Sequence, residues 1–493
     1  MTQSQHLASS GTALETFKTA LKGPDLIERL RAGLIGDGMV IEGPFGPKKM
    51  IYADYVASGR ALRQVEDFVM EEVLPVYANS HTEASYCGMT MTRLREAARS
   101  EIARICRAFD SYATVFCGSG ATAGLNRLVH LLGVSGAAER GENPLVLLGP
   151  YEHHSDILPW RESGAEVIEI NEAADGGPDL VELDLVLSEK AAGRLTVGAF
   201  SLMSNVTGIV TDDVAVTRIL KRHGALSVWD CAGSGPYLPI DMKPGTDAEK
   251  DAVVVSPHKF IGGPAASGVM IVRKQAVCIK TPVFPGGGTV RFVSPWGHDY
   301  SENIAAREEA GTPNVIGDIR AALAFLVKEA IGQAEMDAHN ESWRARALAA
   351  WQENPAIEIL GNLEASHTMP IFSFRVKDLE RGGYIHQQLV TRMLSDVYGV
   401  QARGGCACAG PYAHRLLGID RAESDALRDG ILSGEELKKP GWTRLNFSVL
   451  LDDVKADQII QAVDQLARKP YPVADSYACD ETTARFKAAQ KAA

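Results

Sequence analysis

Two charged residues stand directly after apolar runs of the sequence, where a charge is costly to bury. Asp230 follows the run 225–229, and Lys259 follows the run 252–256 in the segment Ser-Pro-His-Lys. A buried aspartate needs a cationic partner, and a desolvated lysine becomes a nucleophile for Schiff-base chemistry. An aspartate that keeps a pyridine nitrogen protonated and a lysine that binds an aldehyde form the arrangement used with pyridoxal phosphate. A salt bridge or two solvated strand ends would explain each residue taken alone.

A glycine-rich segment, Cys117-Gly-Ser-Gly-Ala-Thr122, lies between an apolar run and a helical pattern. Small residues let the backbone approach a phosphate, and the N-terminus of the following helix presents N–H groups and a partial positive charge. The Thr122 hydroxyl would add a further donor. The alternative is a glycine-rich turn in which Thr122 caps the helix.

Adjacent histidines, His153 and His154, occur in the segment 151–160, just after the apolar run 145–148. Such a pair at a strand end is compatible with a metal, with acid–base chemistry or with an imidazole stacked on a ring. A metal would need further ligands at fixed spacing, and the sequence has none close by, so we expect no metal site. Surface histidines that cap a helix together with Ser155 are the structural alternative.

Two cysteines, Cys406 and Cys408, lie in the segment Arg403-Gly-Gly-Cys-Ala-Cys-Ala-Gly-Pro411. A single Cys-x-Cys pair without a second pair is not a zinc signature. The segment is therefore either a reactive thiol site or a glycine-rich loop with buried thiols. The eight cysteines of the chain are few for its length and mostly lie in hydrophobic runs, which predicts a reducing, cytoplasmic setting.

Strand and helix patterns alternate between these segments and must position them. Helical patterns such as 123–132 and 215–223 separate expected strands at 113–117, 145–148, 167–170, 196–201, 225–230, 252–256 and 268–272. Because several of these strands are apolar nearly throughout, we expect both faces of their sheet to be covered. This predicts an α/β fold with a large, doubly wound, mainly parallel sheet. Residues that follow parallel strands would meet at the carboxyl edge of that sheet.

The pattern changes after Asp318. A long helical stretch over 319–351 leads to sparser strands at 357–360, 371–375, 399–403 and 443–448, which predicts a smaller α+β domain. We therefore expect an N-terminal arm (1–50), with a helix at 25–34, that packs on the small domain. The large cofactor-binding domain would span 51–320, and the small C-terminal domain 321–493.

The composition excludes several classes of protein. The 493 residues include 50 Lys and Arg against 62 Asp and Glu, a net charge of −12 without blocks of like charge, which is unlike a nucleic-acid binder. No apolar run approaches the roughly 18 residues of a membrane span. The first residues lack a basic region followed by an apolar stretch, so we expect no secretory signal.

The motifs follow one another in an order that is itself informative. They are Tyr-Ala-Asp-Tyr-Val-Ala-Ser (52–58), Asn-Ser-His (79–81), Gly-Ser-Gly-Ala-Thr (118–122), Glu-His-His-Ser-Asp-Ile-Leu-Pro-Trp (152–160), Ser-Asn-Val-Thr-Gly (204–208), Trp-Asp-Cys-Ala (229–232), Ser-Pro-His-Lys (256–259), Gly-Gly-Gly (286–288), Glu-Ala-Gly-Thr-Pro-Asn (309–314), Arg-Gly-Gly-Cys-Ala-Cys-Ala (403–409) and Arg-Leu-Asn-Phe (444–447). In this order the chain resembles fold-type I pyridoxal phosphate enzymes of the class V aminotransferase group, most closely the cysteine desulfurase and selenocysteine lyase-like branch. The resemblance spans about residues 51 to 451.

The resemblance implies a role in cofactor binding for several residues. Lys259 would bind the aldehyde of pyridoxal 5′-phosphate covalently, and Asp230 would pair with the ring nitrogen. His153 would stack on the ring and relay protons. The ligands of the phosphate would be the amide of Ala121 and the side chains of Thr122, Ser256 and His258.

Other matching residues would handle the substrate. Asn205 would lie near the ring hydroxyl and the substrate, and His81 would also lie near the substrate. Arg444 would clamp the substrate carboxylate, a bidentate task for which lysine is no replacement. Thr312 and the turn 286–288 would reach the phosphate site of a partner subunit, which implies a homodimer.

The activity implied is the release of alanine from L-cysteine. Cys408 matches the nucleophilic cysteine of the family and would carry the sulfur as a persulfide to an acceptor protein, while Cys406 is an additional thiol. Desulfurases usually carry Asp-x-Ala-Gln, whose glutamine donates to the ring hydroxyl, whereas Gly233 stands in that place here. An aminotransferase, lyase or epimerase acting on another amino acid with the same cofactor is therefore the alternative.

Overall fold

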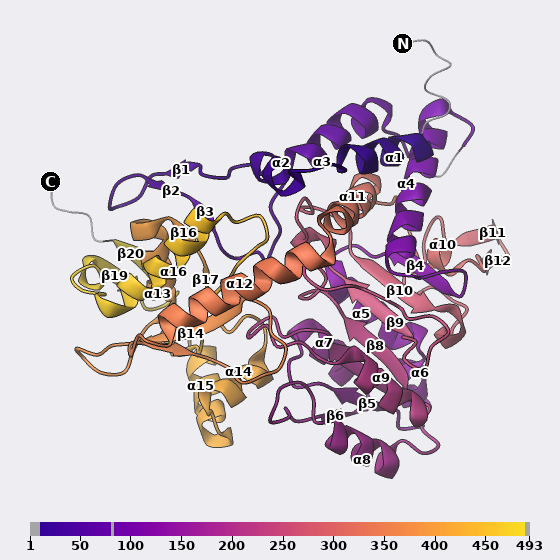
Figure 1. Cartoon of the computed structure of the whole chain (residues 1–493). Coiled ribbons are helices and arrows are strands. Elements are labelled where there is room, and N and C mark those ends of the chain that lie inside the picture. Colours follow the sequence, from indigo (N-terminus) through magenta and orange to yellow (C-terminus); the bar gives the residue numbers. More distant parts are fainter. Residues whose placement is uncertain (1–9, 80–82, 489–493) are drawn as a thin grey trace. The chain divides into compact units, whose positions relative to one another are not determined.

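The computed structural model describes residues 10–79 and 83–488, which form two compact units. Unit 1 comprises the described residues up to 35, 58–203 and 211–333, and unit 2 comprises 36–57, 204–210 and those from 334 onward. Figure 1 labels the elements of both units and colours them along the sequence.

Unit 1 is built on a seven-stranded sheet with the strand order β4-β10-β9-β8-β7-β5-β6. Strands β5 to β9 run parallel to one another, whereas β10 is antiparallel to both β4 and β9. Because β4, β5, β7 and β9 are buried along their whole length, both faces of the sheet are covered. The predicted mainly parallel α/β sheet is thus confirmed. Its strands are β4 (Tyr112–Phe116), β5 (Leu145–Leu148), β6 (Glu166–Glu169), β7 (Thr196–Ser201), β8 (Leu226–Asp230), β9 (Ala252–Val255) and β10 (Val269–Arg273).

Helices pack against this sheet and against one another. Helix α5 packs on β9 and β10, α9 packs on β8, and α4 packs along α11. The apolar side chains of α5 form a core with the sheet, which includes Leu125, Leu128, Val146, Val228 and Met270. The helices of unit 1 are α1 (Ser10–Ala20), α2 (Leu26–Ala32), α3 (Arg63–Phe68), the π-helix η1 (Val69–Val73), η2 (Leu74–Val76), α4 (Tyr86–Ile105), α5 (Gly120–Leu131), α6 (Val134–Glu139), α7 (His154–Glu162), α8 (Leu180–Lys190), α9 (Asp213–Arg222), η3 (Pro257–Lys259), η4 (Lys274–Ala276), α10 (Ile304–Glu308) and α11 (Val315–Ile331).

The long helix expected over 319–351 is two helices, α11 and α12 (Gln333–Trp351). Between them Gly332 has a φ of 83°, a conformation that glycine adopts without a steric penalty. The break also marks the change of unit, because α11 belongs to unit 1 and the residues from 334 belong to unit 2. Apolar periodicity alone continued through the glycine, which is why the sequence predicted one helix.

The expected N-terminal arm is divided between the units. Helix α1 packs on α4 and α11, and the rings of Phe17 and Phe68 meet edge to face with centroids 5.5 Å apart. The second half of the arm belongs to unit 2, where β1 (Val40–Ile41) pairs with β2 (Lys48–Lys49). The apolar side of α1 is buried in unit 1. Only the part of the arm from residue 36 onward therefore belongs to the same unit as the C-terminal residues.

Unit 2 contains an antiparallel sheet with the order β13-β14-β18-β17, to which β15 adds by pairing with β14. Its core includes Trp351, whose ring contacts those of Phe372, Phe374 and Phe447. The strands are β3 (Ile51–Tyr52), β13 (Ile357–Ile359), β14 (Ile371–Lys377), β15 (Tyr384–Ile385), β16 (Val400–Gln401, parallel to β3), β17 (Arg403–Gly405), β18 (Trp442–Asn446), β19 (Tyr477–Asp480) and β20 (Arg485–Ala488). The helices are α12, α13 (Gln387–Tyr398), α14 (Gly410–Leu417), α15 (Arg421–Leu432), η5 (Glu436–Lys438), α16 (Asp453–Arg468) and η6 (Ala474–Ser476). Among the described helices of either unit, none combines the length and the apolar character needed to cross a bilayer.

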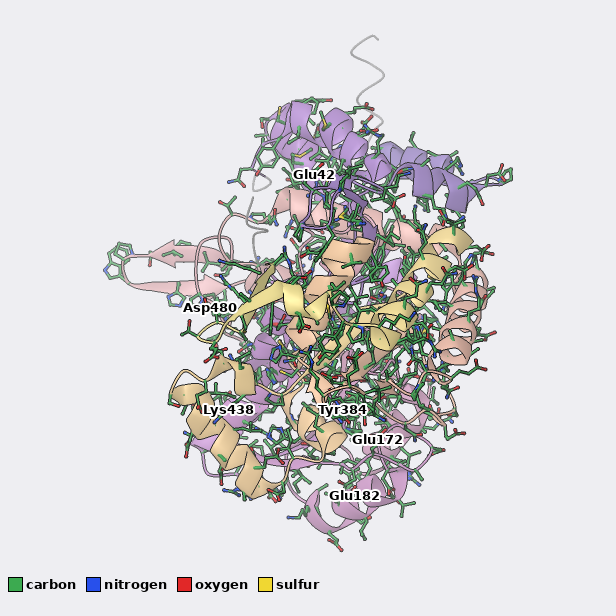
Figure 2. The ribbon with its side chains drawn as sticks, turned by 90° about the vertical axis from the view of Figure 1, so that its left-hand side faces the viewer. Glu42, Glu172, Glu182, Tyr384, Lys438 and Asp480 are labelled. Carbon is green, nitrogen blue, oxygen red and sulfur yellow. The ribbon has the colours of Figure 1, made fainter. Side chains whose placement is uncertain are left out.

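A hairpin projects from unit 1 that the sequence patterns did not predict. Strand β11 (Val290–Ser294) pairs with β12 (Gly297–Tyr300), and Figure 2 shows the two pink strands standing clear of the ribbon from which they arise. Phe292, Val293 and Trp296 are all exposed on this hairpin, and Trp296 is 92% exposed. Large apolar side chains gathered on one exposed element are typical of an interaction surface.

Candidate active site

Asp230 and Lys259 end neighbouring strands of unit 1. Asp230 is the last residue of β8, and Lys259 lies in η3, directly after β9, which is parallel to β8. The Asp230 carboxylate is 5% exposed and accepts a hydrogen bond of 2.7 Å from the Ala232 amide. Burial raises the pKa of Asp230, while that hydrogen bond and the charge of Lys259 oppose the rise. The structure thus brings the predicted acid and the predicted lysine within electrostatic range at the carboxyl edge of the sheet.

The glycine-rich loop that leads into α5 lies against the residue after β9. The Ala121 amide donates to Oγ of Ser256 at 2.9 Å, and the hydroxyls of Thr122 and Ser155 share a hydrogen bond of 2.7 Å. Gly120 has a φ of 67°, and a Cβ at this position would lie 2.7 Å from the Ser256 hydroxyl, so the close approach needs glycine. Hydroxyls gathered at the N-terminus of a long helix form a cradle for an anion such as phosphate.

Two predicted histidines border this loop. His258 faces it, because a Cβ on Gly120 would lie 3.7 Å from the His258 ring. Burial, assisted by the charge of Lys259, lowers the pKa of His258, so its neutral ring can donate one N–H to an anion. His153 caps α7, and its Nδ1 accepts a hydrogen bond of 3.1 Å from the Ser155 amide. The proton of the neutral His153 ring is therefore on Nε2.

Two buried acids next to Asp230 were not among the predicted site residues. Glu152 accepts a hydrogen bond of 2.9 Å from the Ser201 amide and shares one of 2.6 Å with the Ser201 hydroxyl, and Ser201 pairs with Asp230 in the sheet. Asp156 is fully buried, and its Oδ1 accepts a hydrogen bond of 2.9 Å from the Trp160 indole. Burial raises the pKa of both acids, to about 7 for Glu152. Their signal in the sequence was a pair of acids four residues apart at the start of a helix.

Arg444, the predicted carboxylate clamp, is buried in unit 2 and has an acidic partner. Its Nη2 donates to Asp54 at 2.9 Å, and its Nη1 donates to the backbone carbonyl of Asn205 at 3.1 Å. The other carboxylate oxygen of Asp54 accepts a hydrogen bond of 2.9 Å from Nε of Arg403. Because a buried guanidinium without a nearby acid is unfavourable, the ion pair with Asp54 compensates the charge of Arg444 and holds its side chain in place. Sequence analysis missed Asp54, although an acid inside an otherwise apolar run was a usable signal.

Cys406 and Cys408 lie on a tight turn that follows β17. Both are free thiols; Cys408 is exposed and Cys406 is partly buried. The Ala409 amide donates to the Cys406 carbonyl at 3.1 Å, which closes the turn. The side-chain amide of Asn205 donates to the Ala407 carbonyl at 2.9 Å. In unit 2 the structure therefore brings together the thiol turn, Asn205 and, through the backbone of Asn205, the predicted carboxylate clamp.

The two segments predicted to reach a partner subunit form one exposed surface of unit 1. The Gly311 amide donates to the Gly287 carbonyl at 2.8 Å and so joins the segment of Thr312 to the turn 286–288. Thr312 and the three glycines are all exposed. His81, predicted to lie near the substrate, is outside the described residues.

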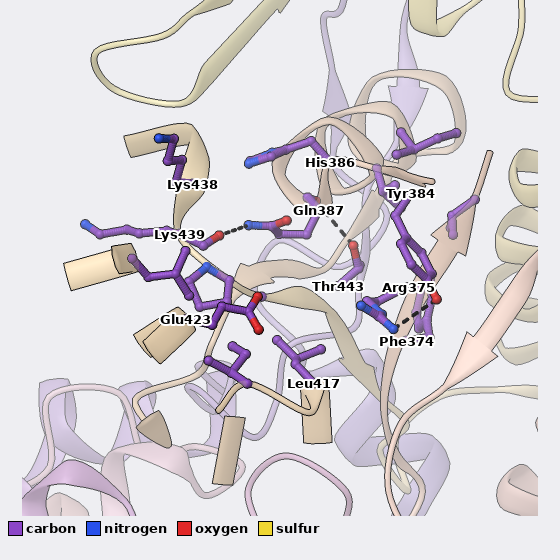
Figure 3. A pocket seen from close by; sticks show the side chains of 17 residues that line it. Phe374, Arg375, Tyr384, His386, Gln387, Leu417, Glu423, Lys438, Lys439 and Thr443 are labelled. Carbon is purple, nitrogen blue, oxygen red and sulfur yellow. Dashed lines mark hydrogen bonds between the residues drawn. The ribbon is translucent and has the colours of Figure 1, made fainter. Parts of the chain in front are cut away.

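A separate cavity of about 300 Å³ in unit 2 contains none of the predicted site residues. Figure 3 shows it between Lys438 and Lys439 on one side and Arg375 and Tyr384 on the other. Each of its three cations has an acidic neighbour within salt-bridge distance: Lys438 with Glu435, Lys439 with Glu436, and Arg375 with Glu358. Since these charges are compensated, the cavity presents no net cationic group to an anionic ligand.

Comparison with known proteins places these sites in context. A family model described as aminotransferase class-V matches residues 51–428. A probable cysteine desulfurase from Streptomyces coelicolor is 28% identical over 399 residues, which cover 78% of this chain and 91% of the relative. A cysteine desulfurase from Pectobacterium atrosepticum is 28% identical over 390 residues, which cover 78% of this chain and 89% of that protein.

The fold is also shared with solved structures. The apo structure of a cysteine desulfurase from Thermococcus onnurineus aligns with a TM-score of 0.71 at 23% identity, over 90% of this chain and 98% of the other. The architecture of both units is therefore that of a known fold, the fold-type I arrangement predicted from the sequence.

Proposed function

The chain belongs to the class-V aminotransferase family, whose members depend on pyridoxal phosphate, and from this premise we propose that it is a cysteine desulfurase that releases alanine from L-cysteine. One observation carries the choice of this reaction within the family. The exposed thiol of Cys408 stands on a turn that Asn205 joins to Arg444, so a sulfur nucleophile and a carboxylate-binding group share one network. Transfer of an amino group needs no thiol, whereas removal of sulfur needs a nucleophile that receives it.

The residues of unit 1 fit pyridoxal 5′-phosphate. Lys259 supplies the amine for its aldehyde, Asp230 supplies a buried acid for its ring nitrogen, and the loop at Ala121 and Ser256 supplies an anion cradle for its phosphate. His153, with its Nδ1 held by the α7 backbone, supplies a ring of fixed orientation. When bound, this cofactor supplies an electron sink that stabilises negative charge on the substrate α-carbon.

The side chains of the protein would perform the remaining steps. Arg444 binds the substrate carboxylate, and the amine of Lys259 moves the proton of the α-carbon. The Cys408 thiolate then attacks the substrate sulfur: a sulfur–sulfur bond forms, and the bond between Cβ and sulfur breaks. The electron pair left on the carbon skeleton is protonated, which yields alanine and leaves a persulfide on Cys408. Because Cys408 is exposed, an acceptor protein can reach that persulfide.

Cys408→Ala, with Cys406→Ala as its matched control, tests this function. With L-cysteine, the unaltered enzyme should release alanine and carry a persulfide on Cys408, measured by amino-acid analysis and by mass spectrometry of the alkylated peptide. Cys408→Ala should retain the cofactor's visible absorbance and lose both products. Cys406→Ala should lose less, namely the onward passage of sulfur through a disulfide or persulfide relay.

Two results would contradict the proposal. Normal alanine release by Cys408→Ala would exclude attack by that thiol. A keto acid or an inverted α-carbon formed from another amino acid in a substrate panel would favour an aminotransferase, lyase or epimerase. Gly233, which stands in place of the expected glutamine donor, is the residue that makes this panel necessary.

We also propose that the enzyme is a cytoplasmic homodimer. Support for the dimer comes from the exposed apolar hairpin at Trp296 and from the exposed surface formed by Thr312 and the turn 286–288. The eight thiols, all free, support a reducing compartment. Sedimentation should show a dimer that Trp296→Asp weakens, whereas Val181→Asp, at another exposed apolar residue, should leave it intact. A fully active monomer would contradict the dimer.

A further inference from the structure

The turn that bears the two cysteines has an unfavourable backbone conformation. Its two central residues, Ala407 and Cys408, have φ values of 54° and 57°, in the left-handed region. A turn with positive φ at both central positions is a type I′ turn, which strongly prefers glycine or asparagine there. Alanine and cysteine carry an energetic penalty in this region, so surrounding contacts must hold the turn.

Asn205 provides such a contact. Its Nδ2 donates to the Ala407 carbonyl at 2.9 Å, and Ala407 is at the centre of the turn. The carbonyl accepts only, so the donor end of the amide must face it and the orientation of the Asn205 side chain is fixed. Asn205 is 9% exposed, and its Oδ1 is buried without a hydrogen-bond donor among the described residues. Among the described residues, the hydrogen bond to the turn is thus the contact that orients this amide.

The backbone that carries Asn205 is itself well anchored in unit 2. The Gly208 amide donates to the Ser204 carbonyl at 3.0 Å, and the Ser204 amide donates to the Ile209 carbonyl at 2.8 Å. The Ser373 hydroxyl donates to the Val206 carbonyl at 2.7 Å, which ties this loop to β14. A movement of the thiol turn therefore requires either loss of the Asn205 hydrogen bond or deformation of a bonded loop.

The same residue also contacts the carboxylate clamp. Nη1 of Arg444 donates to the backbone carbonyl of Asn205 at 3.1 Å. The side chain of Asn205 therefore bonds the thiol turn, and its backbone carbonyl bonds the guanidinium of Arg444. Asn205 thus links the turn to Arg444 beyond the pairing of β17 with β18, in which Arg403 lies opposite Arg444.

We propose that Asn205 is a positioning residue that holds the turn of residues 406–409 in its left-handed conformation and thereby sets the Cys408 thiol relative to Arg444. The inference rests on the proposed function only in taking Cys408 as the nucleophile. The conformation of the turn is independent of that reaction, so the two can be tested separately.

Hydrogen exchange tests the turn without any turnover. The probe is the peptide that spans residues 404–412 in the cofactor-free protein, because the Ala409 amide in it closes the turn. Asn205→Ala should lower the protection of this peptide about fivefold, which corresponds to about 1 kcal/mol for one hydrogen bond. Ala407→Gly should raise protection in the otherwise unaltered chain, since glycine favours positive φ, and this variant carries no risk to the core.

A double variant and a matched control separate positioning from general loosening. Ala407→Gly added to Asn205→Ala should restore the protection, and in the holoenzyme it should restore part of a lost kcat while KM for L-cysteine changes less. Asn354→Ala is the control, because Asn354 is also a buried asparagine of unit 2 whose Nδ2 donates to a backbone carbonyl, that of Asp464 at 3.1 Å. It should leave the exchange of residues 404–412 unchanged.

Each outcome decides the proposal. Unchanged protection in Asn205→Ala, or an equal loss in Asn354→Ala, would overturn it, as would the absence of any rescue by Ala407→Gly. If the exchange results follow expectation but the unaltered holoenzyme releases no alanine from L-cysteine, the proposed reaction fails and the positioning of the turn stands.

Discussion

Replacing Glu152 by glutamine should remove a pH-dependent loss of stability from unit 1. The carboxyl groups of Glu152 and Asp156 are both buried, and the charge of Glu152 adds to the burial that raises the pKa of Asp156. Two buried carboxylates repel each other and offer only acceptors, so the pair is more stable with one proton than with none. Oδ2 of Asp156 is buried, and no side-chain or backbone donor among the described residues reaches it. In Glu152→Gln the side chain is neutral and carries a donor at every pH.

The size of the effect follows from the pKa of Glu152. Burial raises this pKa from its ordinary value of 4.5 to about 7. Across this window the folded chain holds a proton that the unfolded chain has released, so the free energy of unfolding falls as pH rises and levels off above pH 7. At about 1.4 kcal/mol per pH unit, the loss is roughly 3 kcal/mol. The free energy of unfolding of Glu152→Gln minus that of the unaltered protein should therefore increase by about 3 kcal/mol between about pH 4 and pH 8.

Urea unfolding of the cofactor-free proteins at matched pH values measures this difference. Groups distant from this pair contribute equally to both proteins, so their contributions cancel. Glu189→Gln, which changes an exposed acid on α8, is the control and should show no change of the difference with pH. A constant difference for Glu152→Gln across this range would refute the retained proton. A decrease would mean that the pair is stable as two anions.

Two further predictions concern the cofactor residues. Lys259→Ala should fold and lose turnover, and borohydride should no longer fix the cofactor covalently to the chain, as mass spectrometry of the intact protein will show; covalent fixation in the variant would exclude Lys259. Asp230→Asn should still bind the cofactor but lose about 10²–10³-fold in kcat, because it acts mainly on charge that develops in the transition state. A normal kcat in steady-state assays would exclude that role for Asp230.

The sequence predicted the large sheet well because strands buried on both faces consist almost entirely of apolar residues. Strand β7 begins and ends where the apolar run 196–201 predicted it, and β5 matches the run 145–148. Because residues that follow parallel strands meet at the carboxyl edge of the sheet, the sequence also predicted that Asp230 and Lys259 lie near each other. The direction of β10 could not be predicted in this way, since an apolar run reads the same for a parallel and an antiparallel strand.

The contacts that tune the site escaped prediction because they join distant parts of the chain. Asp54 pairs with Arg444 across 390 residues, and neither residue signals the other in the sequence. The hairpin at Trp296 was missed for a different reason. Its strands have exposed apolar residues, so they lack the alternation of buried and exposed positions that identifies a strand.

The sequence also did not predict the unit to which Asn205 belongs. It follows β7 of unit 1 by only four residues, and chain position alone placed it in the large domain with the cofactor residues. In the structure its loop belongs to unit 2, because the Met369 amide donates to the Gly208 carbonyl at 2.8 Å and Ile209 bridges to Thr368. Consequently the groups proposed for the substrate carboxylate and for its sulfur lie in one unit, and those proposed for the cofactor lie in the other. The thiol turn should therefore keep its hydrogen bonds in the cofactor-free protein, which is the state in which its exchange is best measured.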